Sequence, residues 1–225
     1  MLEALVPILS SPALLLGWLA LSLLCLGVLL RDFCKANPEI GRLMRLVWAL
    51  TVLYSGPVGL AVYWGSGRKQ IARDSLWRRG WRSTAHCYSG CGMGEIVGLV
   101  LAVGIIGLSP WPTALVTFAF AFAFTFGLAL TIGPLMADGV GAGQATQDAL
   151  ISETASIVAM EAVAIDSDIW LSGGAGWGEV RFWTSLLVSL TLGLMAAWPV
   201  NVALVALGVK EGMHDPREMA AQGAE

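Results

Sequence analysis

The sequence predicts an all-α membrane protein: a polytopic bundle of about six transmembrane helices with one amphipathic interfacial helix. Hydrophobic residues make up 56% of the chain and charged residues only 13%, against about 25% charged residues in a soluble domain. The mean hydropathy is +0.73, and long apolar stretches recur along the chain. We expect the lipid bilayer as a partner. We expect no nucleic acid, because the basic residues lie in short loops beside the spans.

Six apolar stretches are candidate spans. The first is too long for the apolar region of a signal peptide and lacks a basic start, so we expect it to be retained. Pro57 should kink the second. The fourth contains FAFAFAFTF, whose alternation resembles a strand, but a lone strand in lipid would leave its backbone groups unpaired. The predicted spans are 5–30, 43–65, 89–108, 112–136, 146–165 and 182–208.

The fifth span is the weakest prediction, because its polarity is mixed and it carries two glutamates. Omitting it would leave about 45 residues without regular structure, which is unusual in a compact domain. A helix with polar residues is tolerated when these face the interior of a bundle. We therefore keep 146–165 as a helix. The sixth span is interrupted at Trp198-Pro199.

Loop charges predict the orientation. Six spans place both termini on one side of the membrane, and that side carries eight basic residues against five on the other. This favours cytoplasmic termini. Residues 68–83 mix arginines with Trp77 and Trp81 and predict a helix lying in the cytoplasmic interface. We expect one transmembrane domain over 1–210 and a disordered cytoplasmic tail over 211–225.

The stretch AHCYSGCGMGEIVG at 85–98, where the third span begins, brings reactive and small side chains together. On a helix its glycines form a line at four-residue spacing, where a neighbouring helix can approach closely. One histidine and two cysteines lie within about 70° of that line. A neighbouring helix could therefore complete a site there. The line consists of Gly90, Gly94 and Gly98.

The candidate soft ligands are His86, Cys87 and Cys91, with Glu95 one turn further along. Thiolate and imidazole prefer Cu(I) or Zn(II) to hard cations, and cysteines at i and i+4 can reach one ion. The spacing predicts a metal ion, with copper ahead of zinc. The main alternative is that the cysteines are small apolar core residues. Helix geometry and a reducing compartment disfavour a disulfide between them.

Carboxylates inside the membrane form the second candidate group. Glu153 and Glu161 share one face of the fifth span, with Met160 beside them, and about 12 Å separates the two glutamates along the axis. Glu161 lies near mid-membrane, where a charge costs about 2.5 kcal/mol or more. It is therefore predicted as a metal ligand or proton relay, and a structural hydrogen bond is the alternative. Asn201 follows a proline that frees a carbonyl at membrane depth.

Three blocks resemble a family of bacterial integral membrane proteins, the domain-of-unknown-function family number 4396. They are HCYSGCGMGEIVG at 86–98, SETASIVAMEA at 152–162 and WPVNVALVALGVKEGM at 198–213. The resemblance implies a multi-span helical fold, a histidine–cysteine cluster opening one span, and residence in the inner membrane. Relatives often carry aspartate at the positions of Glu95 and Glu153, so the geometry of these carboxylates is open. The family has no assigned activity. By motif, its positions are His86, Cys87, Cys91, Glu95, Glu153, Glu161 and Asn201.

The leading hypothesis is a transporter of a soft or borderline metal cation, and no catalytic residue is assigned. The histidine and the two cysteines would capture the ion at the cytoplasmic mouth. Glu95, Glu153 and Glu161 would line the route or couple protons, and Asn201 would shape the kinked last helix. One alternative is a membrane thiol-disulfide oxidoreductase. Another is a non-catalytic assembly or sensor subunit, whose glycine line serves a partner, and a homo-oligomer also stays open.

Overall fold

The computed structural model describes residues 2–127, 131–137, 139–213 and 215–222, and every regular element in these residues is helical. This confirms the all-α prediction. In chain order the α-helices are α1 (Leu2–Leu9), α2 (Pro12–Lys35), α3 (Arg42–Ser55), α4 (Pro57–Ser66), α5 (Leu76–Leu99), α6 (Pro110–Phe122), α7 (Ile132–Ala137), α8 (Ala142–Ser172), α9 (Val180–Ala206) and α10 (Pro216–Gln222). Two of these continue as π-helical turns, α5 into η1 (Val100–Ile106) and α6 into η2 (Ala123–Gly127).

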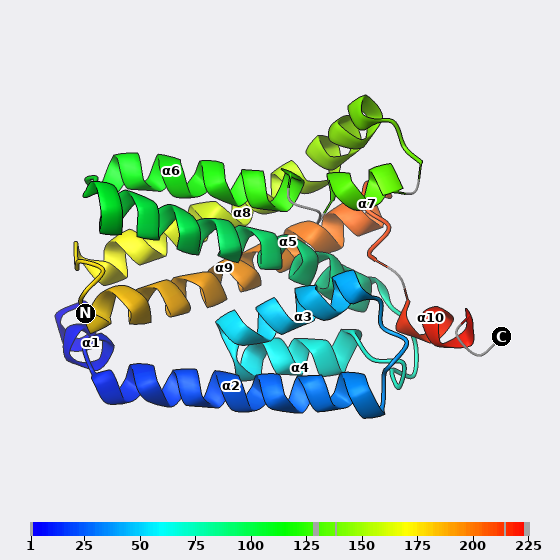
Figure 1. The fold of residues 1–225 in the computed structure, drawn as a ribbon, viewed down its shortest axis with the longest axis horizontal. Coiled ribbons are helices and arrows are strands. Elements are labelled where there is room, and N and C mark those ends of the chain that lie inside the picture. Colours follow the sequence, from blue (N-terminus) through cyan, green and yellow to red (C-terminus); the bar gives the residue numbers. More distant parts are fainter. Residues whose placement is uncertain (1, 128–130, 138, 214, 223–225) are drawn as a thin grey trace.

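Three helices of the described chain are long and apolar enough to cross a membrane: α2, α5 with its π-helical extension, and α9. They are compatible with a membrane protein, in line with the predicted class. The helices are aligned along the long axis of the molecule (Figure 1). α5 is the central element, since it contacts α3, α4, α6, α8 and α9. The π-helical η1 ends at Gly107, whose φ of 74° suits glycine.

The predicted second span, 43–65, is not one crossing. α3 ends at Ser55 and α4 begins at Pro57, with Gly56 between them at φ 53° and ψ −122°. α4 then folds back along α3, so that the Tyr63 ring lies 5.4 Å from the Trp48 ring. A glycine in a conformation that other residues rarely adopt, followed by a proline, breaks the helix completely where the sequence predicted only a kink.

Both ends of the α3–α4 hairpin lie at the same end of the bundle. The Lys69 N–H, just after α4, donates to Asn37 Oδ1, just before α3, at 2.9 Å. The hairpin tip at Gly56 lies beside Ser22, near the middle of α2. Ser22 is about 15 Å along that helix from Asp32, near its end. The hairpin therefore enters the bundle from one end, reaches about half its depth and returns.

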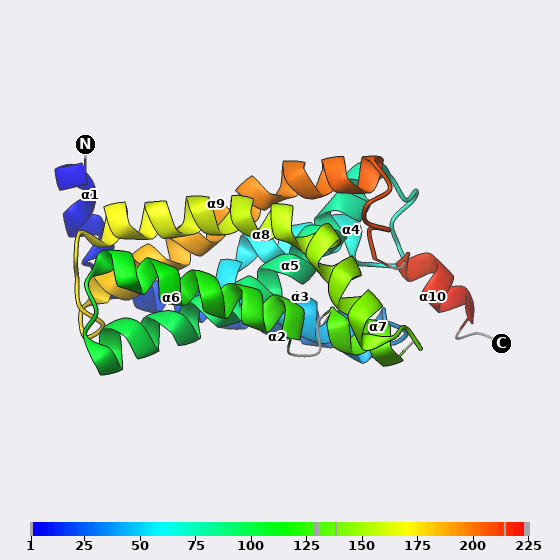
Figure 2. The same ribbon diagram turned by 90° about the horizontal axis from the view of Figure 1, so that it is seen from above.

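The hairpin changes the expected path of the chain. α2, α5, α8 and α9 run the length of the bundle, and α6 with η2 carries the chain back from the end of η1 (Figures 1 and 2). The two termini accordingly lie at opposite ends of the long axis (Figure 1). The prediction that both termini lie on the cytoplasmic side of the membrane stays a prediction, because it depends on which of these helices cross the bilayer.

Three other segments differ from expectation. The first predicted span is broken before Pro12, where the Ser11 side chain caps α2, so α1 and α2 are separate helices. The interval 68–83 is not an interfacial helix, because α5 begins at Leu76 and residues 76–83 are its first two turns. The predicted disordered tail includes α10. Arg82 is buried in α5 through its ion pair with Asp74, at 2.8 Å, which explains how an arginine-rich segment enters the bundle.

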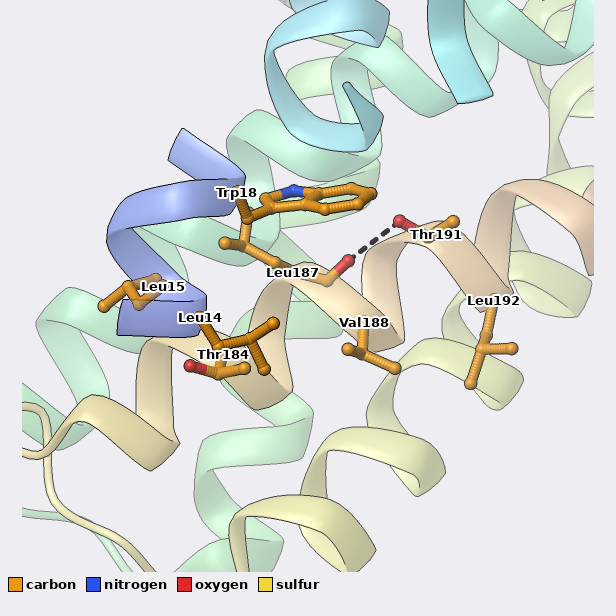
Figure 3. Close-up of a pocket in the computed structure, with 8 residues that line it drawn as sticks. All are labelled: Leu14, Leu15, Trp18, Thr184, Leu187, Val188, Thr191 and Leu192. Atoms are coloured by element: carbon orange, nitrogen blue, oxygen red, sulfur yellow. Dashed lines mark hydrogen bonds between the residues drawn. The ribbon is translucent and has the colours of Figure 1, made fainter. Parts of the chain in front are cut away.

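An apolar groove of about 290 Å³ lies between α2 and the first half of α9 (Figure 3). Leucines and Trp18 line one side. On the other side, the hydroxyls of Thr184 and Thr191 donate to backbone carbonyls of their own helix, at 3.0 and 2.9 Å. The groove therefore presents methyl and methylene groups, with no ionisable side chain among its lining residues.

The conformation at the hairpin tip can be tested. Gly56→Ala is expected to lower the free energy of unfolding by about 1–3 kcal/mol. Alanine would have to hold a positive φ, and its Cβ would lie 2.8 Å from Ser22 Oγ. Thermal unfolding in detergent, followed by circular dichroism, measures the change. The control is Gly27→Ala in α2, where a Cβ meets nothing within 4 Å. Equal behaviour of the two variants would contradict the hairpin.

Candidate functional site

Glycines bring α5 into close contact with its neighbours. A Cβ at Gly94 would lie 2.5 Å from the Ala121 backbone, and one at Gly98 would lie 2.8 Å from the Thr117 Cα, both in α6. Gly90, the first residue of the line, is buried. Only residues without a side chain allow backbones to approach so closely. The glycine line thus faces α6 and fixes how the reactive residues of α5 are oriented.

The two cysteines of α5 form a buried thiol pair. Cys87 Sγ and Cys91 Sγ are 3.9 Å apart, and both residues are fully buried and free. The Ser156 hydroxyl of α8 donates to Cys87 Sγ at 3.5 Å. Thr125 Oγ1, in the π-helical end of α6, lies 3.5 Å from Cys91 Sγ. Three elements therefore meet at the thiol pair, which places it in the core between α5, α6 and α8.

A buried ion pair lies next to the thiol pair. The Lys210 ammonium, just past the end of α9, donates to Glu153 Oε2 at 2.7 Å, to Asn201 Oδ1 at 2.8 Å and to Ser156 Oγ at 3.2 Å. Lys210 is 7% exposed and Glu153 is 6% exposed. Three oxygen acceptors from α8 and α9 thus surround one cation, the arrangement that a buried charge requires.

The segment that carries Lys210 is fixed to the start of α5. Arg79 donates to the Glu211 carbonyl at 2.7 Å, and Arg82 donates to the Gly212 carbonyl at 3.2 Å. Gly212 has a φ of 83°, and a Cβ there would lie 2.6 Å from Arg79 Cβ. We call residues 207–213 the strap. It lies across the end of the bundle next to the ion pair.

His86 lies beside the ion pair. Its Nδ1 lies 4.0 Å from Glu153 Oε1. Asn201 receives a further hydrogen bond from the Ser83 hydroxyl, at 3.0 Å. The predicted three-ligand set of one histidine and two cysteines is therefore split between two neighbouring clusters. Within the described residues, no group of three His, Cys, Asp or Glu side chains is arranged to hold a metal ion.

Carboxylates continue along the buried face of α8. Glu153, Glu161 and Asp168 are all buried, and about 22 Å separates the first from the last along the helix axis. Neither carboxylate oxygen of Glu161 has a hydrogen bond of ordinary geometry within the described chain, where the Cys91 thiol is its weak polar neighbour, and one oxygen of Asp168 is also unpartnered. Glu95 of α5 is also buried with an unpartnered oxygen. A buried carboxyl group without a partner is stable only when it carries a proton or binds a cation.

These carboxylates are close enough to the thiols and to one another to interact. Glu161 interacts electrostatically with both Cys87 and Cys91, and Glu95 interacts with Glu161 and Asp168. The thiol pair, Glu161, Glu95 and Asp168 therefore form a file of ionisable groups between α5 and α8. Met160, which the sequence grouped with the pathway, lies at the contact with Gly193 of α9.

Two polar residues of this region were missed by the sequence reasoning. Lys210 was counted only as a loop charge, although it stands in the block GVKEGM that carried the family resemblance. Asp168 was missed because the predicted span ended at residue 165, whereas α8 continues to Ser172. The seven-residue spacing from Glu161 to Asp168 places both on one helical face, and this signal could have identified it.

Comparison with known proteins gives one match. The model of a protein family described as a domain of unknown function (DUF4396) matches residues 76–210. No curated protein matches the chain, and no solved structure does. The matched region begins with α5 and ends at Lys210, so it contains the thiol pair, the buried ion pair and the file of carboxylates.

The buried ion pair should contribute strongly to stability. Lys210→Met or Glu153→Gln alone leaves one buried group uncompensated, so each is expected to lower the free energy of unfolding by about 3–5 kcal/mol. The double variant should lose much less than the sum of the two. Thermal unfolding in detergent measures all three. The control is Lys69→Met, whose pair with Glu39 is partly exposed, so about 1 kcal/mol or less is expected. Strictly additive losses would contradict a direct interaction.

Proposed function

The chain belongs to the DUF4396 family, whose model covers more than half of its length, and we propose that it is an integral membrane transporter of a soft or borderline metal cation, with copper ahead of zinc. The observation that carries the proposal is the separation of the two thiols, 3.9 Å. Two sulfurs bound to one tetrahedral ion at about 2.3 Å lie about 3.8 Å apart. Cys87 and Cys91 therefore need little rearrangement to share an ion.

Glu161 supports the proposal as the next group along the route. Its buried carboxylate has the Cys91 thiol as a weak polar neighbour and interacts electrostatically with both thiols. Thiols must lose their protons to bind a metal, so capture of the ion releases protons inside the bundle. Glu161, Glu95 and Asp168, which carry protons while no cation is bound, would release those protons in exchange for the cation as it moves onward.

Lys210 would control entry to the thiol pair. Its ammonium occupies the oxygen ligands that Glu153, Asn201 and Ser156 would otherwise offer to an entering cation. Ser156 also contacts Cys87, so the Lys210 ammonium and the proposed metal site have Ser156 as a common neighbour. We propose that Lys210 balances Glu153 while the metal is absent and yields those oxygens as the metal enters. His86, which lies beside Glu153, would help to balance the negative charge of Glu153 once Lys210 has moved away.

The distribution of basic residues supports an orientation for this transporter. All 13 lysines and arginines except Arg181 belong to the end of the bundle where α2 and α9 finish and α5 begins (Figure 1). Basic residues are enriched on the cytoplasmic side of inner membrane proteins. We therefore propose that the C-terminus, the strap and the open end of the α3–α4 hairpin are cytoplasmic, and that the N-terminus lies on the opposite side of the plasma membrane.

The thiol-disulfide alternative is less well supported. A redox partner must reach a thiolate, whereas Cys87 and Cys91 are fully buried. Cys25, the other buried thiol, belongs to a different apolar cluster, around α2, α3 and α4. The metal experiment below separates these two functions.

Metal binding is the first prediction of the proposal. Protein purified without oxygen should contain about one copper or zinc ion per chain, because the ligands are buried thiolates. Cys87→Ser/Cys91→Ser should abolish the metal, measured by elemental mass spectrometry. The matched control, Cys25→Ser/Cys34→Ser, should keep it. Glu161→Gln should retain the ion but lose uptake into proteoliposomes.

Two outcomes would contradict the metal proposal. The first is a wild-type protein that stays metal-free after incubation with Cu(I) or Zn(II). The second is a Cys87–Cys91 pair that interconverts between thiol and disulfide forms in alkylation trapping while binding no metal. The second result would favour the oxidoreductase.

The orientation is tested with a maleimide that cannot cross membranes. Cys34 is the one exposed cysteine and lies at the basic end, so it should be labelled in inverted vesicles and not in intact cells. In Cys34→Ser/Gly178→Cys the new thiol lies in the exposed loop between α8 and α9, and the pattern should reverse. Cys25, Cys87 and Cys91 are buried and serve as internal controls. Labelling of both positions from the same side would refute the odd number of crossings.

A further inference from the structure

A second groove opens at the basic end of the bundle, away from the thiol pair. It lies between the end of α4 and the start of α5 and encloses about 540 Å³. Val62 and Gly65 line it on α4, and Ser75, Trp77, Arg78 and Trp81 line it at the start of α5. The groove combines one cationic side chain with an otherwise largely apolar and aromatic lining. No step of the proposed transport uses it.

Arg78, the cationic side chain of this groove, has no carboxylate partner in the described chain. Arg78 Nε donates to the Gly65 carbonyl at 2.9 Å, and its Nη1 donates to the Arg73 carbonyl. These bonds hold the guanidinium at the groove and leave its charge uncompensated. The neighbouring Arg82, by contrast, is paired with Asp74. Arg73 is exposed and also forms no ion pair with a described residue, and its backbone carbonyl lies next to Arg78, so a second unpaired arginine is a near neighbour of the groove.

The apolar side of the groove is an aromatic wall. The Trp81 ring is stacked on Trp198 of α9 at 4.6 Å, and the Trp77 ring lies 5.3 Å from the same residue. Trp77 is nevertheless 57% exposed. Tryptophans gather at the depth of lipid headgroups, where one edge is wet and the other apolar. The wall therefore lies where headgroups meet acyl chains.

We propose that this groove binds an anionic phospholipid of the cytoplasmic leaflet. The phosphate would accept hydrogen bonds from Arg78 and attract Arg73, and the glycerol and upper acyl chain would lie along Val62, Trp77 and Trp81. Basic pockets between membrane helices on the cytoplasmic side suit such headgroups. A zwitterionic lipid is a poorer ligand because it brings its own cation. The proposal rests on the chain spanning a bilayer and is independent of the metal.

Native mass spectrometry of the full-length protein in detergent tests the proposal, with phosphatidylglycerol and phosphatidylcholine as the two probes. The wild type should bind phosphatidylglycerol more tightly than phosphatidylcholine. Arg78→Gln should weaken phosphatidylglycerol binding about fivefold, the effect of one basic residue at a membrane surface. The exposed Arg73→Gln should weaken it in the same direction and does not disturb the hydrogen bond to Gly65. Arg181→Gln, at the opposite end, should leave binding unchanged.

Three results would overturn the lipid site. One is equal binding of the two lipids. Another is unchanged phosphatidylglycerol binding in both Arg78→Gln and Arg73→Gln. The third is displacement of the lipid by an equal concentration of inorganic phosphate, which would identify a site for the free anion. Loss of metal binding in the cysteine variants should not alter any of these measurements, so the two proposals can fail separately.

Discussion

The close approach of α5 to its neighbours is the constraint on which the rest of the structure depends. At Gly94 and Gly98 the backbone of α6 occupies the space that a side chain would need. At Gly92 the ring of Tyr54 from α3 does the same, 2.6 Å from where a Cβ would lie. Lipid gives helices no hydrophobic reason to associate with each other, so contacts of this kind hold a membrane bundle together. Because α5 is fixed on two sides, its thiols can only face α8 and the end of α6.

The buried ion pair connects this central helix to the end of the chain. Lys210 comes from the strap, Glu153 from α8 and Asn201 from α9, while Ser83 of α5 donates to the same asparagine. Arg79 and Arg82 hold the strap from the α5 side. Glu153 is therefore linked to the strap through Lys210, and Lys210 is linked to the thiol pair through Ser156. A change in the charge of Glu153 would alter both sets of contacts. Such an arrangement is costly to break, and in the proposed transporter it would connect the entry of the cation to the position of the strap.

The sequence predicted the helical class and the clustering of polar residues on α5, α8 and α9, because these depend on local spacing. Residues four apart share a helical face, so Cys87 and Cys91 were bound to be neighbours. His86 precedes Cys87 and points about 100° away, and the partner that it meets, Glu153, could not be deduced from spacing within α5. Lys210 was unpredictable for a similar reason. Its position depends on the backbone path of the strap after α9, which passes through Gly208 and Gly212 at positive φ.

The hairpin of α3 and α4 shows what hydropathy alone could not resolve in the predicted second span. Two short apolar helices joined by Gly56-Pro57 have the same length and composition as one kinked span. The difference lies in one backbone conformation, φ 53° at Gly56, and in the polar contacts that join Lys69 to Asn37 and Glu39 at the open end. In the proposed topology the hairpin is not counted as a crossing, so every later helix takes the opposite direction and the weak asymmetry of basic residues becomes nearly complete. Loop charge and helix geometry then agree, and this agreement argues for the hairpin more strongly than either observation alone.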